Sequence, residues 1–255
     1  MRIRFAGLGV AALCSLSGCA GVPSANRAEA ARPRAFLVPR DTFYPSLTLV
    51  AVEPVVVPRD LDYPEAVREQ LEAAIEDELR AAAIDVVPAA EVAPLVREIA
   101  LAQGGFYDPV TGELDQAKEK AIEAEVERTL EERFHPDAVL HPALWIRQAG
   151  VFGDIASWDG FTQWALLESF WHAKGWRGRL SALSLVVKLT RPGGEALYAK
   201  AGGLQLLAKL DADGEPYELP QAELFLEPKR TTAAVRRALD ELVGMTPELR
   251  RLGGR

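Results

Sequence analysis

Cysteine is almost absent from this chain, which has Cys14 and Cys19 and none after residue 19. The remainder of the chain therefore lacks a disulfide, a zinc-thiolate site and a cysteine nucleophile. Histidine is also scarce, and the spacing of His135, His141 and His172 matches neither a helical i, i+4 pair of ligands nor an HExxH zinc motif. We accordingly expect no metal site and no other cofactor.

Basic charge is in deficit, with 29 Lys and Arg against 37 Asp and Glu. The formal net charge of -8 argues against nucleic-acid binding, and also against adhesion to anionic lipid by charge alone. Long apolar runs are missing as well, because nothing beyond residue 19 approaches the ~20 residues that a membrane-spanning helix needs.

The N-terminal segment has the features of an export signal. Arg2 and Arg4 precede an apolar run over residues 5–16 that is too short for a permanent spanning helix. The run ends in LSGC at residues 16–19, which resembles the bacterial lipobox, where the signal is cut before the cysteine and the thiol carries lipid. We therefore expect residues 1–18 to be a lipoprotein signal peptide and Cys19 to be the lipidated anchor.

The stretch that follows, residues 19–46, is rich in alanine and contains four prolines, Pro23, Pro33, Pro39 and Pro45. Prolines at these positions forbid a long helix, so the stretch is predicted to be a tether. Ala20 stands directly after Cys19, where an aspartate would resemble an inner-membrane retention signal. This favours anchoring in the outer membrane, with the domain facing the periplasm.

Residues 47–255 are predicted to form one domain of the α/β class, with α+β as the alternative. The apolar runs at 47–57 and 138–146 are typical of strands covered on both faces. Helices are expected at 65–83, 91–102, 115–134 and from Thr231 or Thr232 to Gly244, a short strand at 84–88, and a β-hairpin over 179–210 with a bulge at Gly202 and Gly203. This order predicts a mixed sheet with helices packed on it.

Together with the lipobox and the tether, the LVAVEPVVV, IDVVP and FHPDAVLHPALWI segments resemble the α/β domain of bacterial envelope lipoproteins. That group includes the curli secretion channel family, the lipoproteins that activate penicillin-binding proteins, and related uncharacterised families. The resemblance covers roughly residues 47–210. It implies an envelope location and a domain that acts by binding partners rather than by catalysis.

All five tryptophans lie between residues 145 and 176, in and just before a segment of about 147–178 that is predicted to be an aromatic-rich insertion. Large aromatics with polar neighbours are typical of interface hot spots. We expect a partner-binding surface there, although filling of the core is the competing interpretation, above all for Trp145. The surface residues would be Trp158, Phe161, Trp164, Trp171 and Trp176.

No catalytic motif is recognisable, since the chain has neither a G-x-S-x-G elbow nor a P-loop. We therefore expect a non-enzymatic protein that binds another component of the cell envelope, either a different protein or further copies of itself. The alternative is a periplasmic hydrolase of cell-wall or glycan substrates, with Asp154, Asp159 or Glu168 as acid or base. Glu53, Asp137 and His141 could also converge at a sheet edge, and the row Glu119, Glu123, Glu127 and Glu131 is expected to be a solvated helix face.

Overall fold

The computed structural model describes residues 35–58, 61, 65–109, 111–167, 176–211 and 213–244. These described residues belong to one compact unit. The predicted signal peptide, Cys19 and the first part of the predicted tether lie outside the described residues. The last part of that tether does not behave as a linker, because Phe43 and Tyr44 are buried in the main core. The folded unit therefore includes residues 35–46, which come before the predicted domain start at Leu47.

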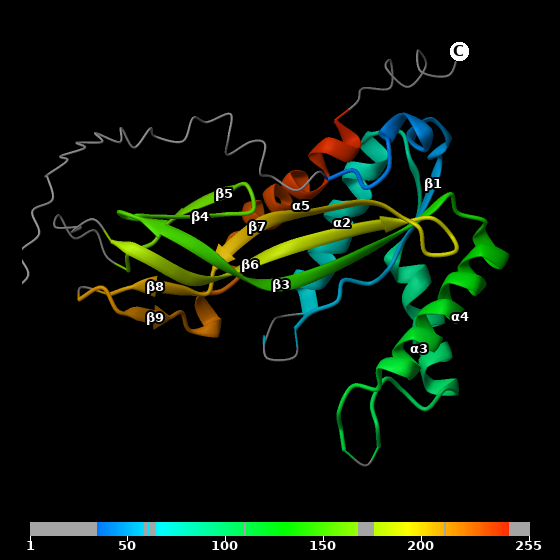
Figure 1. The fold of residues 1–255 in the computed structure, drawn as a ribbon, viewed down its shortest axis with the longest axis horizontal. Helices are drawn as coiled ribbons and strands as arrows, with labels where there is room; N and C mark the ends of the chain where they lie inside the picture. The colour runs from blue at the N-terminus through cyan, green and yellow to red at the C-terminus, as the bar shows by residue number, and fades with distance from the viewer. Residues whose placement is uncertain are drawn as a thin grey trace, which may run out of the picture. The chain divides into compact units, whose positions relative to one another are not determined.

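The centre of the fold is a mixed sheet in which parallel and antiparallel pairs meet on one long strand (Figure 1). That strand, β3, pairs in parallel with β1, which pairs in parallel with β2. On its other side β3 pairs antiparallel with β6, and β6 with β7. The bounds are β1 Leu49–Val52, β2 Asp85–Val87, β3 Ala138–Phe152, β6 Arg177–Thr190 and β7 Ala196–Leu206.

Both faces of the sheet carry helices, which confirms the predicted mixed α/β class. Val50 and Val52 of β1 point into the core beneath α2 and α5, whereas Ala51 points into a core beneath α3 and α4. The unbroken apolar run predicted this arrangement, because a strand buried on both faces has no polar side. The helices are α2 Glu65–Ala81, α3 Ala89–Ala102, α4 Gln116–Phe134 and α5 Pro228–Val243, with short 3-10 turns at Arg40–Thr42, Tyr44–Ser46 and Gln221–Glu223.

The predicted hairpin over residues 179–210 is confirmed as β6 and β7, but it has two irregularities where one was expected. One lies between Leu189 and Thr190, and the other falls one residue later than the predicted bulge at Gly202 and Gly203. Leu183 pairs with Gln205 and Ser184 with Gly203, so that Leu204 is the extra residue of the bulge. Gly202 lies against α5 so closely that a Cβ atom there would be 2.1 Å from the Ala234 carbonyl oxygen. Glycine at this position allows the strand and the helix to approach each other.

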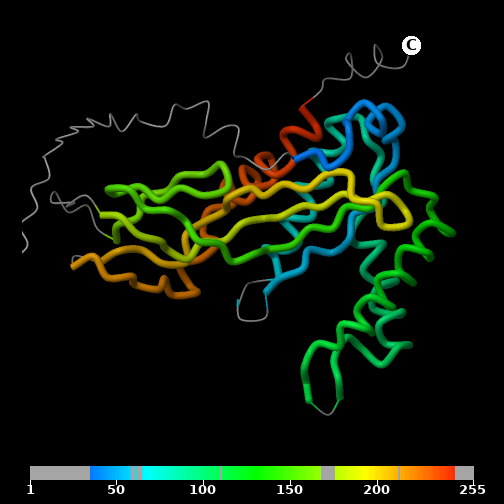
Figure 2. The backbone as a smooth tube through the Cα atoms, viewed as in Figure 1, coloured from blue at the N-terminus to red at the C-terminus, as the bar shows by residue number. Residues whose placement is uncertain are grey.

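Beyond the helices, the aromatic segment continues the sheet instead of forming a separate insertion. β3 runs on to Phe152 and turns into β4 and β5, which bend over toward β7 (Figure 2). Gly203 N donates to Asp159 O at 3.0 Å, and a bridge joins Leu166 to Leu210. The added strands are β4 Ile155–Trp158 and β5 Phe161–Trp164, whereas β8 Ala208–Leu210 and β9 Pro216–Glu218 pair with each other in a separate two-stranded sheet.

This bend encloses a further hydrophobic core, separate from the two under the helices, and we call it the second core because the helix-covered cores share the central strands. Its wall comes from both ends of the aromatic segment and from β6 to β8. The buried members are Ala149, Val151, Ala156, Trp158, Ala165, Leu166, Leu180, Ala182, Leu206, Ala208 and Leu210.

Candidate functional site

An apolar row crosses the outer face of the sheet at the tip of β3, β4 and β5. Phe152 of β3 is directly opposite Ile155 of β4, and Ile155 is directly opposite Trp164 of β5. Directly paired residues place their side chains on the same face of a sheet, so these three form one continuous strip. We call it the tip row.

The tip row is exposed because the strand period directs its neighbours inward. Val151 and Ala156, which alternate with Phe152 and Ile155, are buried in the second core. The exposed fractions of the row are 72% for Phe152, 42% for Trp164 and 39% for Ile155. Single exposed apolar residues are ordinary, but a contiguous strip of three large ones indicates an interaction site.

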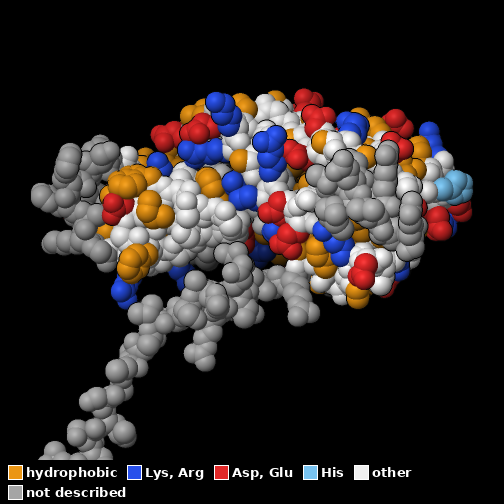
Figure 3. Space-filling view, turned by 90° about the horizontal axis from the view of Figure 1, so that it is seen from above, with side chains coloured by type: hydrophobic (Ala, Val, Ile, Leu, Met, Phe, Trp, Pro, Cys, Tyr) orange, Lys and Arg blue, Asp and Glu red, His pale blue; other side chains and the backbone are white. Residues whose placement is uncertain are grey.

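Basic side chains border the tip row on β6. Arg177 is paired with Phe152 in the sheet, and its guanidinium carbon lies 5.2 Å from the centre of the phenyl ring. A cavity of about 140 Å³ lies beside it, lined by Arg177, Arg179, Trp176 and Val151, among others. In the space-filling view, hydrophobic side chains gather at this end of the sheet (Figure 3). The outer face of the tip thus combines an apolar strip with a cationic edge, a combination that suits a binding surface.

Two of the five predicted surface residues are directed inward. Trp158 is only 7% exposed and its Nε1 donates to the Leu183 carbonyl at 3.2 Å. Phe161 packs edge-on against Trp158 and is stacked under the guanidinium of Arg237, at 4.3 Å. Trp158 is therefore a core residue, contrary to its predicted surface placement, because it closes the second core at the bend of the sheet.

The other three predicted surface residues do not lie together. Trp164 belongs to the exposed tip row, and Trp171 lies outside the described residues. Trp176 is half-buried over Gly214, where an added Cβ would lie 1.4 Å from the indole. Phe152 and Ile155 are not among the five predicted surface residues, although their alternation with buried Val151 and Ala156 is the signal that identifies them.

Trp145 is exposed, which excludes the competing interpretation that it fills the core. It lies in β3 two residues from Arg147, whose guanidinium carbon is 4.9 Å from the centre of the indole ring. No contact in the described ranges places Trp145 in the tip row.

The two described carboxylates proposed for hydrolysis are not close to each other in the sheet. Asp154 and Asp159 stand at opposite ends of β4, and Glu168 lies outside the described residues. The Asp159 carboxylate accepts a hydrogen bond from Ser184 Oγ at 2.6 Å and lies 3.6 Å from Arg147 Nε. Asp159 therefore fastens the turn after β4 to the sheet.

A second polar group joins His141 to two neighbouring strands. His141 Nδ1 lies 2.7 Å from Glu53 Oε2, and His141 Nε2 lies 2.8 Å from Thr190 Oγ1. The order of a hydroxyl, an imidazole and a carboxylate is that of a catalytic triad, but the Thr190 hydroxyl belongs to a side chain that is buried. A nucleophile must reach its substrate, so this chain of hydrogen bonds is better understood as a tie between strand ends.

Asp137, the third residue expected at this edge, has a different role. Its Oδ2 accepts hydrogen bonds from Thr48 N, Thr48 Oγ1 and Leu49 N, at 2.7, 2.7 and 2.9 Å. Burial acts to raise the pKa of the Asp137 carboxyl, but these hydrogen bonds outweigh it and hold the pKa below its ordinary value. Asp137 therefore fixes the register in which β1 meets β3.

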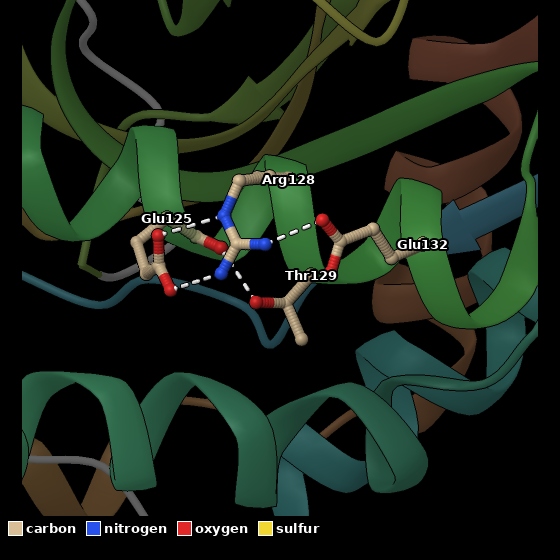
Figure 4. Close-up of polar contacts among 4 residues, drawn as sticks. All are labelled: Glu125, Arg128, Thr129 and Glu132. Atoms are coloured by element: carbon tan, nitrogen blue, oxygen red, sulfur yellow. Dashed lines mark hydrogen bonds and ion pairs between the residues drawn. The ribbon is translucent and has the colours of Figure 1, made fainter.

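The acidic face of α4 is solvated, as predicted, with Glu123 and Glu131 exposed and Glu119 and Glu127 half-buried. Figure 4 shows the neighbouring face, where Arg128 donates to both Glu125 oxygens, at 3.0 and 2.5 Å, and to Glu132 at 2.5 Å. These hydrogen bonds raise the pKa of Arg128 and lower that of Glu125. Exposed pairs of this kind stabilise a helix modestly and are screened by salt.

Although the side chain of Glu123 is exposed, its carboxyl is partly desolvated by the surrounding protein, which raises its pKa, and the like charges of Glu119 and Glu53 act in the same direction. Glu123 thus belongs to the surroundings of His141. Within the described ranges, however, no three His, Cys, Asp or Glu side chains are grouped so that they could hold a metal ion. Nor does any helix in the described part of the chain have the length and apolarity to cross a membrane.

Fold and site together define a mixed α/β domain with an exposed apolar strip at one end of its sheet. Comparison with protein-family models gives no match, and comparison with curated protein sequences gives none. Among solved structures, the chain is similar to lipoprotein GNA1162 from Neisseria meningitidis, with 14% identity and a TM-score of 0.36 over 78% of this chain and 99% of that chain. A likeness at this level does not carry a function from one protein to the other.

Proposed function

We propose that this protein is a lipid-anchored, non-enzymatic component of the cell envelope that binds another envelope protein through the tip row. The observation that carries the proposal is the strip of Phe152, Ile155 and Trp164, three large apolar side chains exposed side by side on adjacent strands. The LSGC motif supports the envelope location, because a cysteine lipidated at residue 19 would tether the domain to the outer membrane.

The tip suits a protein partner because of its chemistry and its rigidity. Aromatic residues and arginine are enriched in interface hot spots, and Arg177 stands directly beside Phe152. The row is built on paired strands, so its side chains are held in place before a partner arrives and little ordering entropy is lost. The bordering arginines favour a partner whose matching rim is acidic.

Hydrolysis is not part of the proposal, since neither of the two polar groups described above presents an accessible nucleophile or a shared pair of carboxylates. Asp159 is engaged by Ser184 and Arg147, and Thr190 is buried.

Crosslinking in intact cells tests the proposal. The variant Phe152→Ser/Trp164→Ser removes most of the strip, and Ser157→Ala/Thr162→Ala changes two exposed residues of the next row on the same face. We expect the wild type and the control to give the same crosslinked partner, and the first variant to lose it, with affinity for the purified partner reduced at least ~10-fold. An unchanged partner profile in the first variant, at wild-type abundance and thermal stability, would remove the tip row from the function.

A further inference from the structure

A cavity of about 130 Å³ lies where β5, β7 and β8 meet the loop that leads into α5. It is distinct from the tip row, and Gln163, Gln205, Lys209, Glu223 and Arg230 are among the residues that line it. We propose that this cavity binds a carboxylate, carried either by a small organic acid or by the C-terminus of a peptide.

Gln205 supplies the first reason. Its side-chain oxygen accepts a hydrogen bond from Phe225 N at 3.1 Å, which fixes the amide so that Nε2 is the remaining donor. Gln205 is only 5% exposed, and its Nε2 has no hydrogen-bond partner in the described part of the chain. Buried donors are rarely left unpaired, so this one indicates an acceptor that is brought by a ligand.

Gln163 supplies a second donor by the same logic. Its Oε1 accepts from Leu206 N at 2.9 Å, and its Nε2 is therefore the donor end of the amide. The two glutamines come from β5 and β7, strands that are brought together by the bend of the sheet. Two amide donors on one cavity favour a ligand group with two acceptor oxygens.

The positive end of α5 makes a charged acceptor preferable to a neutral one. The helix begins at Pro228, and its N-cap residue, Glu227, makes no capping hydrogen bond through its side chain. Pro228 has no N–H and Arg230 N donates to Glu227 O, so the helix contributes mainly its dipole, which favours an anion, and the half-buried Lys209 adds a positive charge to the lining.

Acidic residues at the cavity restrict the charge of the ligand. Glu227 pairs with Arg230 at 2.6 Å, so these two charges compensate each other. Glu223 is exposed and can direct its carboxylate to water, but it would repel a second negative charge. The cavity is therefore expected to prefer a single carboxylate to a dicarboxylate.

The backbone of the loop is strained where it contacts Gln205. Phe225, which is not glycine, has a φ of 61°, in the left-handed region. Such strain persists where the surroundings enforce it and is concentrated at ligand sites. Here it positions the Phe225 amide to orient Gln205.

Calorimetric titration of the full chain tests the inference with three probes: propionate, trialanine with a free C-terminus, and trialanine amide. Both free acids should bind, and the amide should bind at least ~10-fold more weakly because it lacks the charge. Tighter binding of trialanine than of propionate identifies a peptide C-terminus as the ligand, whereas equal binding identifies a small acid. If neither acid binds up to about 10 mM, or if the amide binds equally well, the inference is wrong.

Two variants and a control locate the binding. Gln205→Met and Lys209→Met should each weaken carboxylate binding by about 10-fold. Lys229→Met should not, because Lys229 lies in the first turn of α5 but does not line the cavity. Lys209 is partly exposed, so its variant remains informative even if Gln205→Met unfolds. Wild-type affinity in Lys209→Met would overturn the assignment. Crosslinking through the tip row should be unaffected, which separates this result from the proposed function.

Discussion

Trp158 and Trp164 are six residues apart and face opposite ways, and the turn between them explains why. In β4 the even-numbered residues point into the second core, whereas in β5 the odd-numbered ones do. The two-residue turn Asp159–Gly160, with φ angles of 38° and 72°, reverses the parity by pairing Trp158 with Phe161. An Asp-Gly pair between apolar segments is a strong hairpin signal, so the sequence contained the information that separates the core aromatic residues from the surface ones.

The two tryptophans should respond differently to truncation. Trp158→Ala is expected to lower the free energy of unfolding by ~3–5 kcal/mol, because it opens a cavity in the second core and removes a buried hydrogen bond. Trp164→Ala should change it by less than about 0.5 kcal/mol. Urea denaturation of both variants measures the difference, and equal losses would contradict the assignment of Trp164 to the surface.

Asp137 should make stability depend on pH in a defined direction. Its pKa is lowered in the folded state, so its contribution is present above the ordinary value near 3.9 and is lost as pH falls through the lowered folded value. We expect Asp137→Asn to be less stable than the wild type by about 1 kcal/mol at neutral pH. Thermal melts from pH 7 to about pH 3 should show that gap closing below about pH 4. A gap that is constant with pH would show that the charge plays no part.

At the scale of elements, the strand that was predicted to end at Ile146 continues to Phe152. The prediction followed continuous apolarity, which stops where the helices no longer cover both faces. From Ala149 onward one face is buried and the other is open, so apolar and exposed residues alternate while the strand continues.

Helix α5 begins three residues before the predicted Thr231, at Pro228, a residue well suited to the first helical position.

The contact between β7 and α5 gives a prediction at this scale. Gly202→Ala should lower the free energy of unfolding by ~1–3 kcal/mol, since the new methyl group would overlap the Ala234 carbonyl and force the helix away. Gly178→Ala is the matched control, because a Cβ there meets nothing within 4 Å. Denaturation of both variants tests this, and a neutral Gly202→Ala would mean that α5 packs less closely than described.

For the whole molecule, the α/β class followed from the order of apolar runs, but the closure of the second core did not. That closure depends on contacts such as Leu166 with Leu210, which join residues far apart in sequence and leave no local pattern. The candidate site was likewise predictable only in part. The aromatic concentration indicated the region, while the pairing of Phe152, Ile155 and Trp164 came only from the register of three strands.

Anchoring also belongs to this scale. Cys19→Ser should release a folded domain from the membrane fraction, because residue 19 is the predicted lipid attachment. Fractionation of cells that express the variant, with abundance and protease resistance as controls for folding, measures this. Quantitative retention in the outer membrane would indicate a second means of attachment.

Helix α5 covers one side of the main core. It covers β7 and packs on α2, while Ala238 and Leu242 accept hydrogen bonds through their carbonyl oxygens from Tyr198 Oη and Arg40 Nη2. A polypeptide that stops before Pro228 would expose the apolar side chains of β7 and α2 that α5 covers, and proteases could then cleave it. Resistance to digestion is therefore expected to depend on the presence of α5.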